Sequence, residues 1–222
     1  MTETLQTPQV KICGLTRAAE AQECVALGAS AIGCVFYPPS PRHLTLDQAR
    51  HICEALPSAT VTVGVFVNAD FDHIVETVKF CSLKAVQLHG QESNELVNRL
   101  HQEKITVIKA LFSTRQPFLT DAEQYDAKAF LVECGQGRMP GGNAEQWNWR
   151  EARGVGRFHA LILAGGLAPD NIAAAISSCE PDAVDVSSGV ESAPGRKDLD
   201  RVKAFIDEVT RCRLQRTIRR IF

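Results

Sequence analysis

Short apolar runs alternate with longer amphipathic stretches along the whole chain. The apolar runs are nearly continuous, as expected of strands that are covered on both faces. They predict strands over residues 9–13, 31–36, 60–68, 85–89, 106–110, 129–133, 160–164 and 183–187. The stretches between them predict helices over residues 17–27, 46–56, 70–80, 92–101, 119–124, 149–152, 169–177 and 199–209.

This alternation of strand and helix is typical of a parallel sheet with crossover helices. Repeated along 222 residues, it predicts an α/β protein with a single-domain (β/α)8 TIM barrel over residues 1–210. Thr16 and Thr45 are placed to cap the first two helices, and Pro169 suits a first helical turn.

Composition narrows the classes of function. The chain has 24 Lys and Arg against 26 Asp and Glu, which gives a net charge of −2 and no reason to expect a nucleic-acid partner. No apolar run approaches the roughly 18 residues of a membrane span. The 8 cysteines are scattered without close pairs, and the chain opens on polar residues. We therefore expect a cytoplasmic protein with no structural metal.

The chain ends in a basic extension, residues 211–222, that includes five arginines. Such a segment can bind an acidic partner or anionic lipid. We favour a helical extension with a solvated basic face, or a disordered tail, and expect that deleting residues 213–222 leaves activity intact.

In a TIM barrel the active site lies at the carboxyl ends of the strands and in the loops that follow them. Cys13 ends the first predicted strand and precedes Gly14, which places it at this rim. A thiol can act as a base when a nearby cation lowers its pKa, and Lys11 shares its strand face. The alternative is a cysteine packed under the rim.

Other polar residues lie at the same rim. Arg42 ends a proline-stiffened loop and can bind a carboxylate, or it is a surface arginine. Glu133 ends the sixth predicted strand and is either a general acid or a partner of Arg138 or Lys109. His89 follows the fourth strand and is either a site residue or a structural histidine.

Glycine-bearing loops follow the last three predicted strands, at residues 140–143, 164–167 and 186–190. Glycine lets backbone N–H groups approach a ligand closely, and Ser187 and Ser188 add hydroxyl donors. Because the loops after the seventh and eighth strands of this fold often bind phosphate, we expect a phosphate site here.

Several segments in order carry a resemblance. They are Lys-Ile-Cys-Gly (11–14), Ser-Pro-Arg (40–42), Gly-Val-Phe-Val-Asn (64–68), Val-Gln-Leu-His-Gly (86–90), Leu-Ala-Gly-Gly (163–166), Val-Asp-Val-Ser-Ser-Gly-Val-Glu (184–191) and Pro-Gly-Arg-Lys-Asp (194–198). Over about residues 9–209 the chain resembles the phosphoribosylanthranilate isomerases, which act in tryptophan biosynthesis.

The resemblance implies a cofactor-free Amadori rearrangement of N-(5-phosphoribosyl)anthranilate to 1-(2-carboxyphenylamino)-1-deoxyribulose 5-phosphate. It implies that Cys13 is the general base at ribose C2′ and that Glu133 is the general acid at the ring oxygen. It assigns Arg42 to the anthranilate carboxylate, and His89 and Asp185 to substrate binding. The implied phosphate ligands are Gly142, Gly165, Gly166, Ser187, Ser188 and Gly189. We expect this small molecule as partner and a monomer or homodimer.

Two segments depart from the family. Residues 131–134 read Leu-Val-Glu-Cys where an aspartate is usual, and residues 141–144 read Gly-Gly-Asn-Ala. The altered acid supports an alternative, a sugar-phosphate-binding barrel that has lost catalysis. A related isomerase acting on a histidine-pathway aminoaldose would be expected to carry aspartates on strands one and five, where this chain has Cys13 and Lys109.

Overall fold

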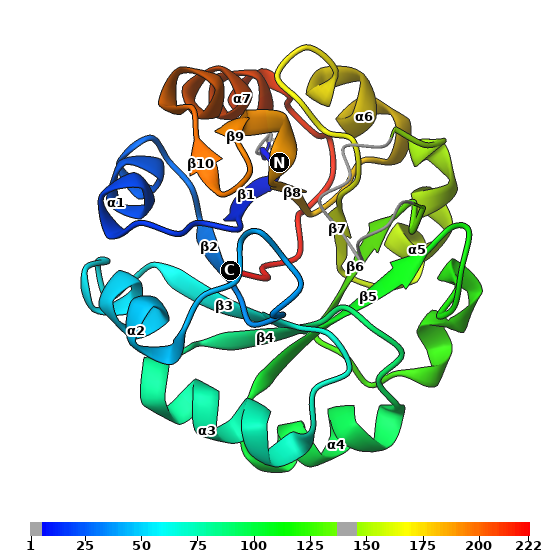
Figure 1. Cartoon of the computed structure of the whole chain (residues 1–222). Coiled ribbons are helices and arrows are strands. Elements are labelled where there is room, and N and C mark those ends of the chain that lie inside the picture. Colours follow the sequence, from blue (N-terminus) through cyan, green and yellow to red (C-terminus); the bar gives the residue numbers. More distant parts are fainter. Residues whose placement is uncertain (1–5, 137–145) are drawn as a thin grey trace.

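The predicted TIM barrel is confirmed. The computed structural model describes residues 6–136 and 146–222, and in it eight parallel strands close into a barrel in chain order. Figure 1 looks along this barrel, with helices surrounding the strands. The strands are β1 (Gln9–Cys13), β2 (Ala31–Val35), β3 (Val61–Phe66), β4 (Ala85–Leu88), β5 (Thr106–Phe112), β6 (Ala129–Glu133), β7 (Leu161–Leu163) and β8 (Ala183–Val186).

Helices connect the strands over the outside of the barrel. They are α1 (Ala18–Ala26), α2 (Leu46–Glu54), α3 (Phe71–Cys81), α4 (Asn94–Gln102), α5 (Arg153–Phe158), α6 (Ile172–Cys179) and α7 (Leu199–Arg211), with 3-10 turns η1 (Leu119–Gln124), η2 (Trp149–Ala152) and η3 (Ser188–Val190). The Thr45 cap is confirmed, because its side chain accepts from Gln48 N in a capping box.

Two of the expected helix starts are wrong. Thr16 does not cap α1; its hydroxyl donates to Gly195 O at 2.7 Å instead, and Arg17 occupies the cap position. Pro169 precedes α6, which begins at Ile172 after Asn171 has bonded back to Gly166 O and Ala168 N. In both places a hydrogen bond to a neighbouring loop replaces the cap that local sequence suggested.

Two elements were not predicted. Helix α5 contains Gly154 and Gly156, whose weak helix propensity hides it in the sequence. After η3 the chain forms a two-stranded hairpin, β9 (Glu191–Ala193) and β10 (Arg196–Lys197), which turns at Gly195 with a φ of +76°. This hairpin brings Glu191 into contact with both Arg42 and Lys197.

Side chains alternate between the two faces of each strand. On β1, Val10 and Ile12 belong to the large cluster between barrel and helices, whereas the fully buried Lys11 and the Cys13 thiol lie on the opposite, inner face. A second cluster fills the interior with small and branched residues: Ala31, Val63, Ala85, Ile108, Ala110, Phe112, Ala129, Leu131, Ala160, Ile162, Ala164 and Ala183. This packed interior supports the polar rim above it.

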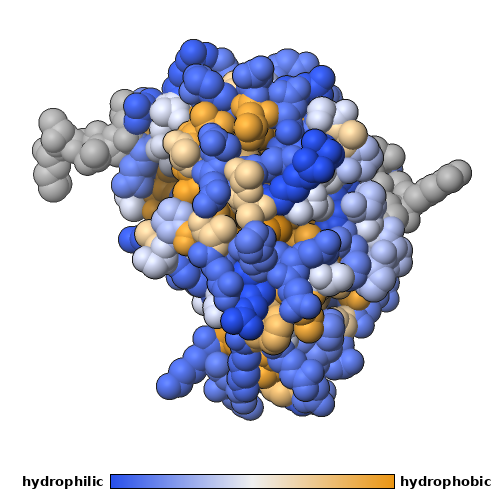
Figure 2. Space-filling model, turned by 60° about the vertical axis from the view of Figure 1, so that its left-hand side comes forward, coloured by the Kyte–Doolittle hydropathy of each residue, from blue (hydrophilic) through white to orange (hydrophobic). Residues whose placement is uncertain are grey.

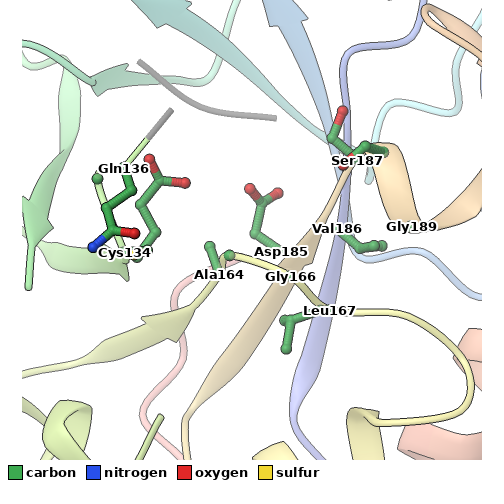
Figure 3. A pocket seen from close by; sticks show the side chains of 13 residues that line it. Cys134, Gln136, Ala164, Gly166, Leu167, Asp185, Val186, Ser187 and Gly189 are labelled. Carbon is green, nitrogen blue, oxygen red and sulfur yellow. The ribbon is translucent and has the colours of Figure 1, made fainter. Parts of the chain in front are cut away.

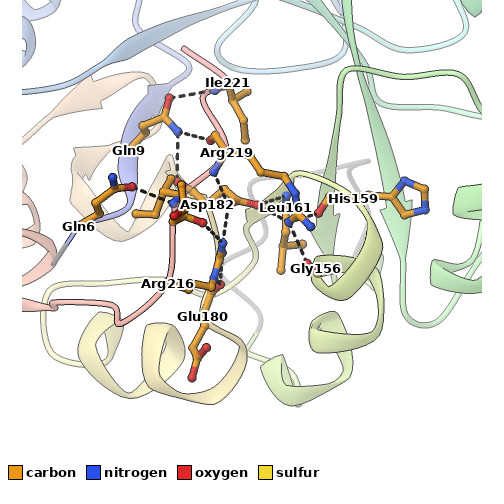
Figure 4. Close-up of polar contacts among 12 residues, drawn as sticks. Gln6, Gln9, Gly156, His159, Leu161, Glu180, Asp182, Arg216, Arg219 and Ile221 are labelled. Carbon is orange, nitrogen blue, oxygen red and sulfur yellow. Dashed lines mark hydrogen bonds and ion pairs between the residues drawn. The ribbon is translucent and has the colours of Figure 1, made fainter. Parts of the chain in front are cut away.

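The C-terminal segment is neither a helix nor a free tail. Beyond α7 it runs irregularly back across the barrel, so that Ile221 and Phe222 pack against the interior cluster. Arg216 and Arg219 pair with the buried Asp182 at 2.8 Å and 3.3 Å (Figure 4). The expected solvated basic face is therefore wrong for these two arginines, because a buried carboxylate draws them inwards.

Figure 2 shows one face of the molecule that is mainly hydrophilic, with smaller hydrophobic areas between. Among residues 6–136 and 146–222, no helix has the length and apolar character needed to cross a membrane.

Candidate active site

Cys13 lies at the inner rim of the barrel, in contact with a buried charge pair. Lys11 Nζ donates to Asp185 Oδ1 at 2.7 Å, which ties β1 to β8, and Lys11 also interacts with the Cys13 thiol. Adjacent strands bring these residues together, since Lys11 is in register with Asp185. The predicted sharing of one strand face by Lys11 and Cys13 is confirmed.

Burial and charge act in opposite directions on this thiol. Burial raises the pKa of Cys13, and the positive charges of Lys11 and Lys197 lower it, but the net shift is upwards. For Lys11, burial lowers the pKa, and Asp185 and Cys13 outweigh it to raise the pKa overall. The charge of Asp185 also raises the pKa of Cys13, so the two lysines oppose both burial and this carboxylate.

Glycines make room for Cys13 and for the loop that carries Arg42. A Cβ on Gly33 of β2 would lie 2.6 Å from Cys13 Sγ, and one on Gly14 would lie 2.4 Å from Arg42 Cδ. Gly14 also has a φ of +76°, which a side chain would strain. The backbone at these two positions thus sets where the thiol and the guanidinium can lie.

Arg42 is not a surface arginine, because it is 8% exposed and bound to a carboxylate. Its Nε and Nη2 donate to Glu191 Oε1 and Oε2 at 2.8 and 2.6 Å. Lys197 Nζ donates to the same Glu191 Oε1 at 2.7 Å and to Ser187 O at 3.1 Å. Burial acts to raise the pKa of Glu191, but hydrogen bonds from Arg42 and Lys197 dominate and lower it.

Glu133 and His89 face each other across the rim. His89 Nε2 lies 3.1 Å from Glu133 Oε1, and His89 Nδ1 lies 2.8 Å from Gln87 Nε2. Lys109 is not a partner of Glu133: it lies on the outer side of β5, where it donates to Glu92 at 2.8 Å. The other proposed partner, Arg138, lies outside the described residues.

The glycine-bearing loops line a pocket beside Glu133 and Asp185. Figure 3 shows the Asp185 carboxylate pointing into it, between Gln136 from the loop after β6 and Ser187 from the loop after β8. Gly165 and Gly166 have φ values of +84° and +67°, and a Cβ on Gly189 would lie 1.9 Å from Leu167 O. The predicted phosphate residues that line it are Gly165, Gly166, Ser187, Ser188 and Gly189. The predicted Gly142 lies outside the described residues.

The structure thus brings the described candidates to one rim and adds three that were given no role. Gln87 is the polar residue before His89 on an inward face, so strand alternation could have found it. Glu191 and Lys197 depend on the hairpin β9–β10, which had no alternation signal. Within the described part of the chain, no group of three or more His, Cys, Asp or Glu side chains could hold a metal ion.

Chemically, the rim offers a thiol supported by lysines on one side and a carboxyl group bound to an imidazole on the other. Such a pair can remove a proton from one atom of a ligand and deliver a proton to another. The adjacent pocket, with backbone glycines and serine hydroxyls, suits an anionic group.

Comparison with known proteins agrees with this architecture. Residues 10–208 match the family of N-(5'-phosphoribosyl)anthranilate (PRA) isomerases. The chain is 50% identical to the N-(5'-phosphoribosyl)anthranilate isomerase of Desulfatibacillum aliphaticivorans over 214 residues, which cover 96% of this chain and 98% of that protein.

Two crystal structures of phosphoribosylanthranilate isomerases also match. The enzyme from Thermotoga maritima has a TM-score of 0.82 and 38% identity, over 91% of this chain and 98% of that one. A second, in complex with reduced 1-(o-carboxyphenylamino)-1-deoxyribulose 5-phosphate, has a TM-score of 0.79 and 39% identity over the same shares. The chain therefore belongs to the N-(5'-phosphoribosyl)anthranilate isomerase family.

Proposed function

We propose that Cys13 and Glu133 carry out the isomerisation for which the family is named, with Cys13 as general base and Glu133 as general acid. The substrate is N-(5-phosphoribosyl)anthranilate and the product is 1-(2-carboxyphenylamino)-1-deoxyribulose 5-phosphate. The observation that carries the assignment is the contact of the buried Cys13 thiol with Lys11, itself bound to Asp185 in the pocket that Glu133 lines.

Two proton transfers by the protein carry the substrate to an enolamine. Glu133 protonates the ring oxygen, the bond from that oxygen to C1′ breaks, and the nitrogen lone pair forms an iminium. The iminium acidifies C2′, so the Cys13 thiolate can remove its proton and leave an enolamine. The enolamine becomes the ketone when C1′ gains a proton and the hydroxyl on C2′ loses one. The cationic intermediate also favours the thiolate, since an opposite charge nearby lowers the pKa of an acid.

The remaining predicted residues hold the two ends of the substrate. We propose that the phosphate binds between the loops of Gly165, Gly166 and Ser187–Gly189, where the positive φ values of Gly165 and Gly166 expose backbone N–H groups. Arg42 is proposed to hold the anthranilate carboxylate. Because its Nε and Nη2 are bound to Glu191, the nitrogen left for the substrate is Nη1.

His89 and Asp185 are assigned to the substrate through their neighbours. Asp185 faces the pocket while accepting from Lys11, so it can orient the sugar hydroxyls. His89 contacts Glu133 directly and can accept or donate there. A cytoplasmic location is proposed because all 8 cysteines are free, and a monomer or homodimer is the expected assembly.

The test is turnover of freshly prepared phosphoribosylanthranilate, followed by its fluorescence. We expect Cys13→Ala and Glu133→Gln each to lower kcat by roughly 10²–10⁴-fold, the usual contribution of a general base or acid. The matched control is Cys34→Ala, which removes a buried thiol from the outer cluster beside β2 and should keep normal turnover.

Growth of a tryptophan auxotroph that lacks the isomerase gives a second readout of the same activity. Binding of the substrate without turnover by the wild-type protein would instead favour a barrel that has lost catalysis. Normal turnover by Cys13→Ala or Glu133→Gln would remove that residue from its role.

A further inference from the structure

Gln87, His89 and Glu133 form a buried chain of hydrogen bonds at the rim. Gln87 and His89 are two positions apart at the end of β4, so both face inwards, and they are 1% and 6% exposed. The Gln87 amide reaches His89 Nδ1 at 2.8 Å, and His89 Nε2 reaches Glu133 at 3.1 Å. Phe112 packs against the imidazole with its ring centre 5.5 Å away and nearly perpendicular.

The orientation of the Gln87 amide decides which ring nitrogen of His89 carries a proton. An amide nitrogen can only donate, so His89 Nδ1 must accept when Gln87 Nε2 faces it. The imidazole is then neutral, its proton is on Nε2, and it donates to a Glu133 carboxylate. In this arrangement Glu133 holds no proton that it could give to a substrate.

The oxygen of the Gln87 amide, Oε1, is buried without a hydrogen-bond partner among the described residues. If the amide turns by half a turn, Oε1 faces Nδ1 and the NH2 group takes the position without a partner. Each orientation satisfies one end of the amide and leaves the other unpaired, so neither is strongly preferred on that count.

The turned orientation of the Gln87 amide fits the state in which the His89–Glu133 pair holds the acid proton. With Oε1 as acceptor, Nδ1 must carry a proton. His89 Nε2 can then accept from a protonated Glu133, or the imidazole is cationic beside a carboxylate. In both forms the pair holds one proton more than in the first orientation.

We propose that Gln87 is a positioning residue whose amide turns as the His89–Glu133 pair gains and loses the acid proton. The inference rests on the proposed role of Glu133. When Glu133 delivers its proton to the ring oxygen, the pair is one proton short, and Gln87 presents Nε2 to His89. When water returns a proton to the His89–Glu133 pair, Gln87 turns and presents Oε1 to His89 Nδ1.

Other charged groups face this pair and act in the background of any pH profile. Arg115, from the loop after β5, interacts electrostatically with Glu133 and with Glu92. Asp185 of β8 lines the same pocket as Glu133. The Glu92 carboxylate accepts hydrogen bonds from Lys109 and from the backbone N–H of Gly90, the residue after His89.

The first test is the proton position on His89 in the wild-type protein. Histidine labelled with 15N reports the tautomer through the shifts of the two ring nitrogens, and loss of one signal set in His89→Gln assigns them. We expect the Nε2–H tautomer at high pH and a protonated Nδ1 at low pH. A proton that stays on Nε2 alone from acid to alkaline pH would overturn the proposal.

The second test changes what Nδ1 meets. Gln87→Met offers neither donor nor acceptor, and we expect kcat to fall about tenfold with KM within about threefold, as for a lost hydrogen bond made in the reacting state. Gln87→Glu presents acceptors to Nδ1 when ionised, so activity should persist to higher pH than in the wild type. Nδ1 should then stay protonated across that range.

Thr62→Val is the matched control, because it removes another buried side-chain oxygen, on β3, a strand that is not adjacent to the β6 strand of Glu133. Its kcat should be unchanged. If both Gln87 variants keep the wild-type kcat and pH profile while Glu133→Gln is inactive, the positioning role is refuted and the acid survives. If Glu133→Gln retains activity, the proposed acid itself fails.

Discussion

Deletion of residues 213–222 should destabilise the barrel without altering its chemistry. This segment lies at the amino ends of the strands, where Gln9 of β1 accepts from Ile221 N and Phe222 N. Asp182, which precedes β8, is 0% exposed and accepts from Arg216 and Arg219 (Figure 4). The active-site residues are at the opposite ends of the strands.

The magnitude follows from these contacts. Removing the partners of a buried charge is destabilising by about 3–5 kcal/mol, and the partial exposure of both arginines places this case near the lower value. Loss of the half-buried Ile221 and Phe222 adds about 1 kcal/mol each. With a total near 5 kcal/mol and about 2–4 °C per kcal/mol for a chain of this size, Tm should fall by about 10–20 °C.

A double-mutant cycle with Asp182→Asn isolates the charge. Asparagine keeps an acceptor for Leu161 N, which now donates to Asp182 Oδ2 at 2.9 Å. In the full chain Asp182→Asn should lower Tm, because the arginines lose a charged partner. In the truncated chain it should raise Tm, because it removes a buried charge without partners. Calorimetry would refute this reasoning if truncation moved Tm by less than about 3 °C, or if Asp182→Asn destabilised both chains equally.

Three further outcomes concern the site, and a fourth concerns helix α5. Lys11→Met removes a charge that lowers the pKa of Cys13, so this pKa rises further and the increase of kcat/KM with pH should move to higher pH; an unmoved profile would exclude Cys13 as the titrating base. Gly33→Ala adds a Cβ 2.6 Å from Cys13 Sγ and should lower kcat by roughly 100-fold, because the thiol must shift. Gly154→Ala in α5 adds a Cβ with no atom within 4 Å, so it should raise the free energy of unfolding by about 0.5–1 kcal/mol. Arg42→Lys keeps the charge, but a single ammonium group cannot hold Glu191 as Arg42 does and also reach the substrate carboxylate, so KM should rise about tenfold with kcat nearly constant; an unchanged KM would place the substrate carboxylate elsewhere.

The sequence was sufficient for the barrel and for the first candidates because both depend on local patterns. Runs of apolar residues located all eight strands, and the position of a residue at a strand end located Cys13, Glu133 and Asp185 at the rim. In a parallel barrel those ends necessarily meet on one side. No contact between strands had to be known.

The same patterns failed where two faces of a strand are equally apolar. Lys109 follows Val107 and Ile108 in a strand buried on both sides, so nothing indicated that it faces outwards to Glu92. Glu191 and Arg42 are 149 positions apart in the sequence, so no local pattern could indicate that they form an ion pair. Their contact depends on the hairpin β9–β10, which carries Glu191. The arginines of the tail looked solvated because their partner, Asp182, lies more than 30 positions away.

The two sides of the site differ in a way that matches their proposed roles. A base must lose its proton, and the charges of the buried Lys11 and Lys197 lower the pKa of Cys13 against burial and the charge of Asp185, which raise it. An acid must regain a proton after each turnover, and the partner of Glu133 is His89, an imidazole that can carry a proton and that is itself bonded to Gln87. The lysines therefore lie beside the proposed base, whereas the proposed acid is bound to a group that can exchange a proton with it.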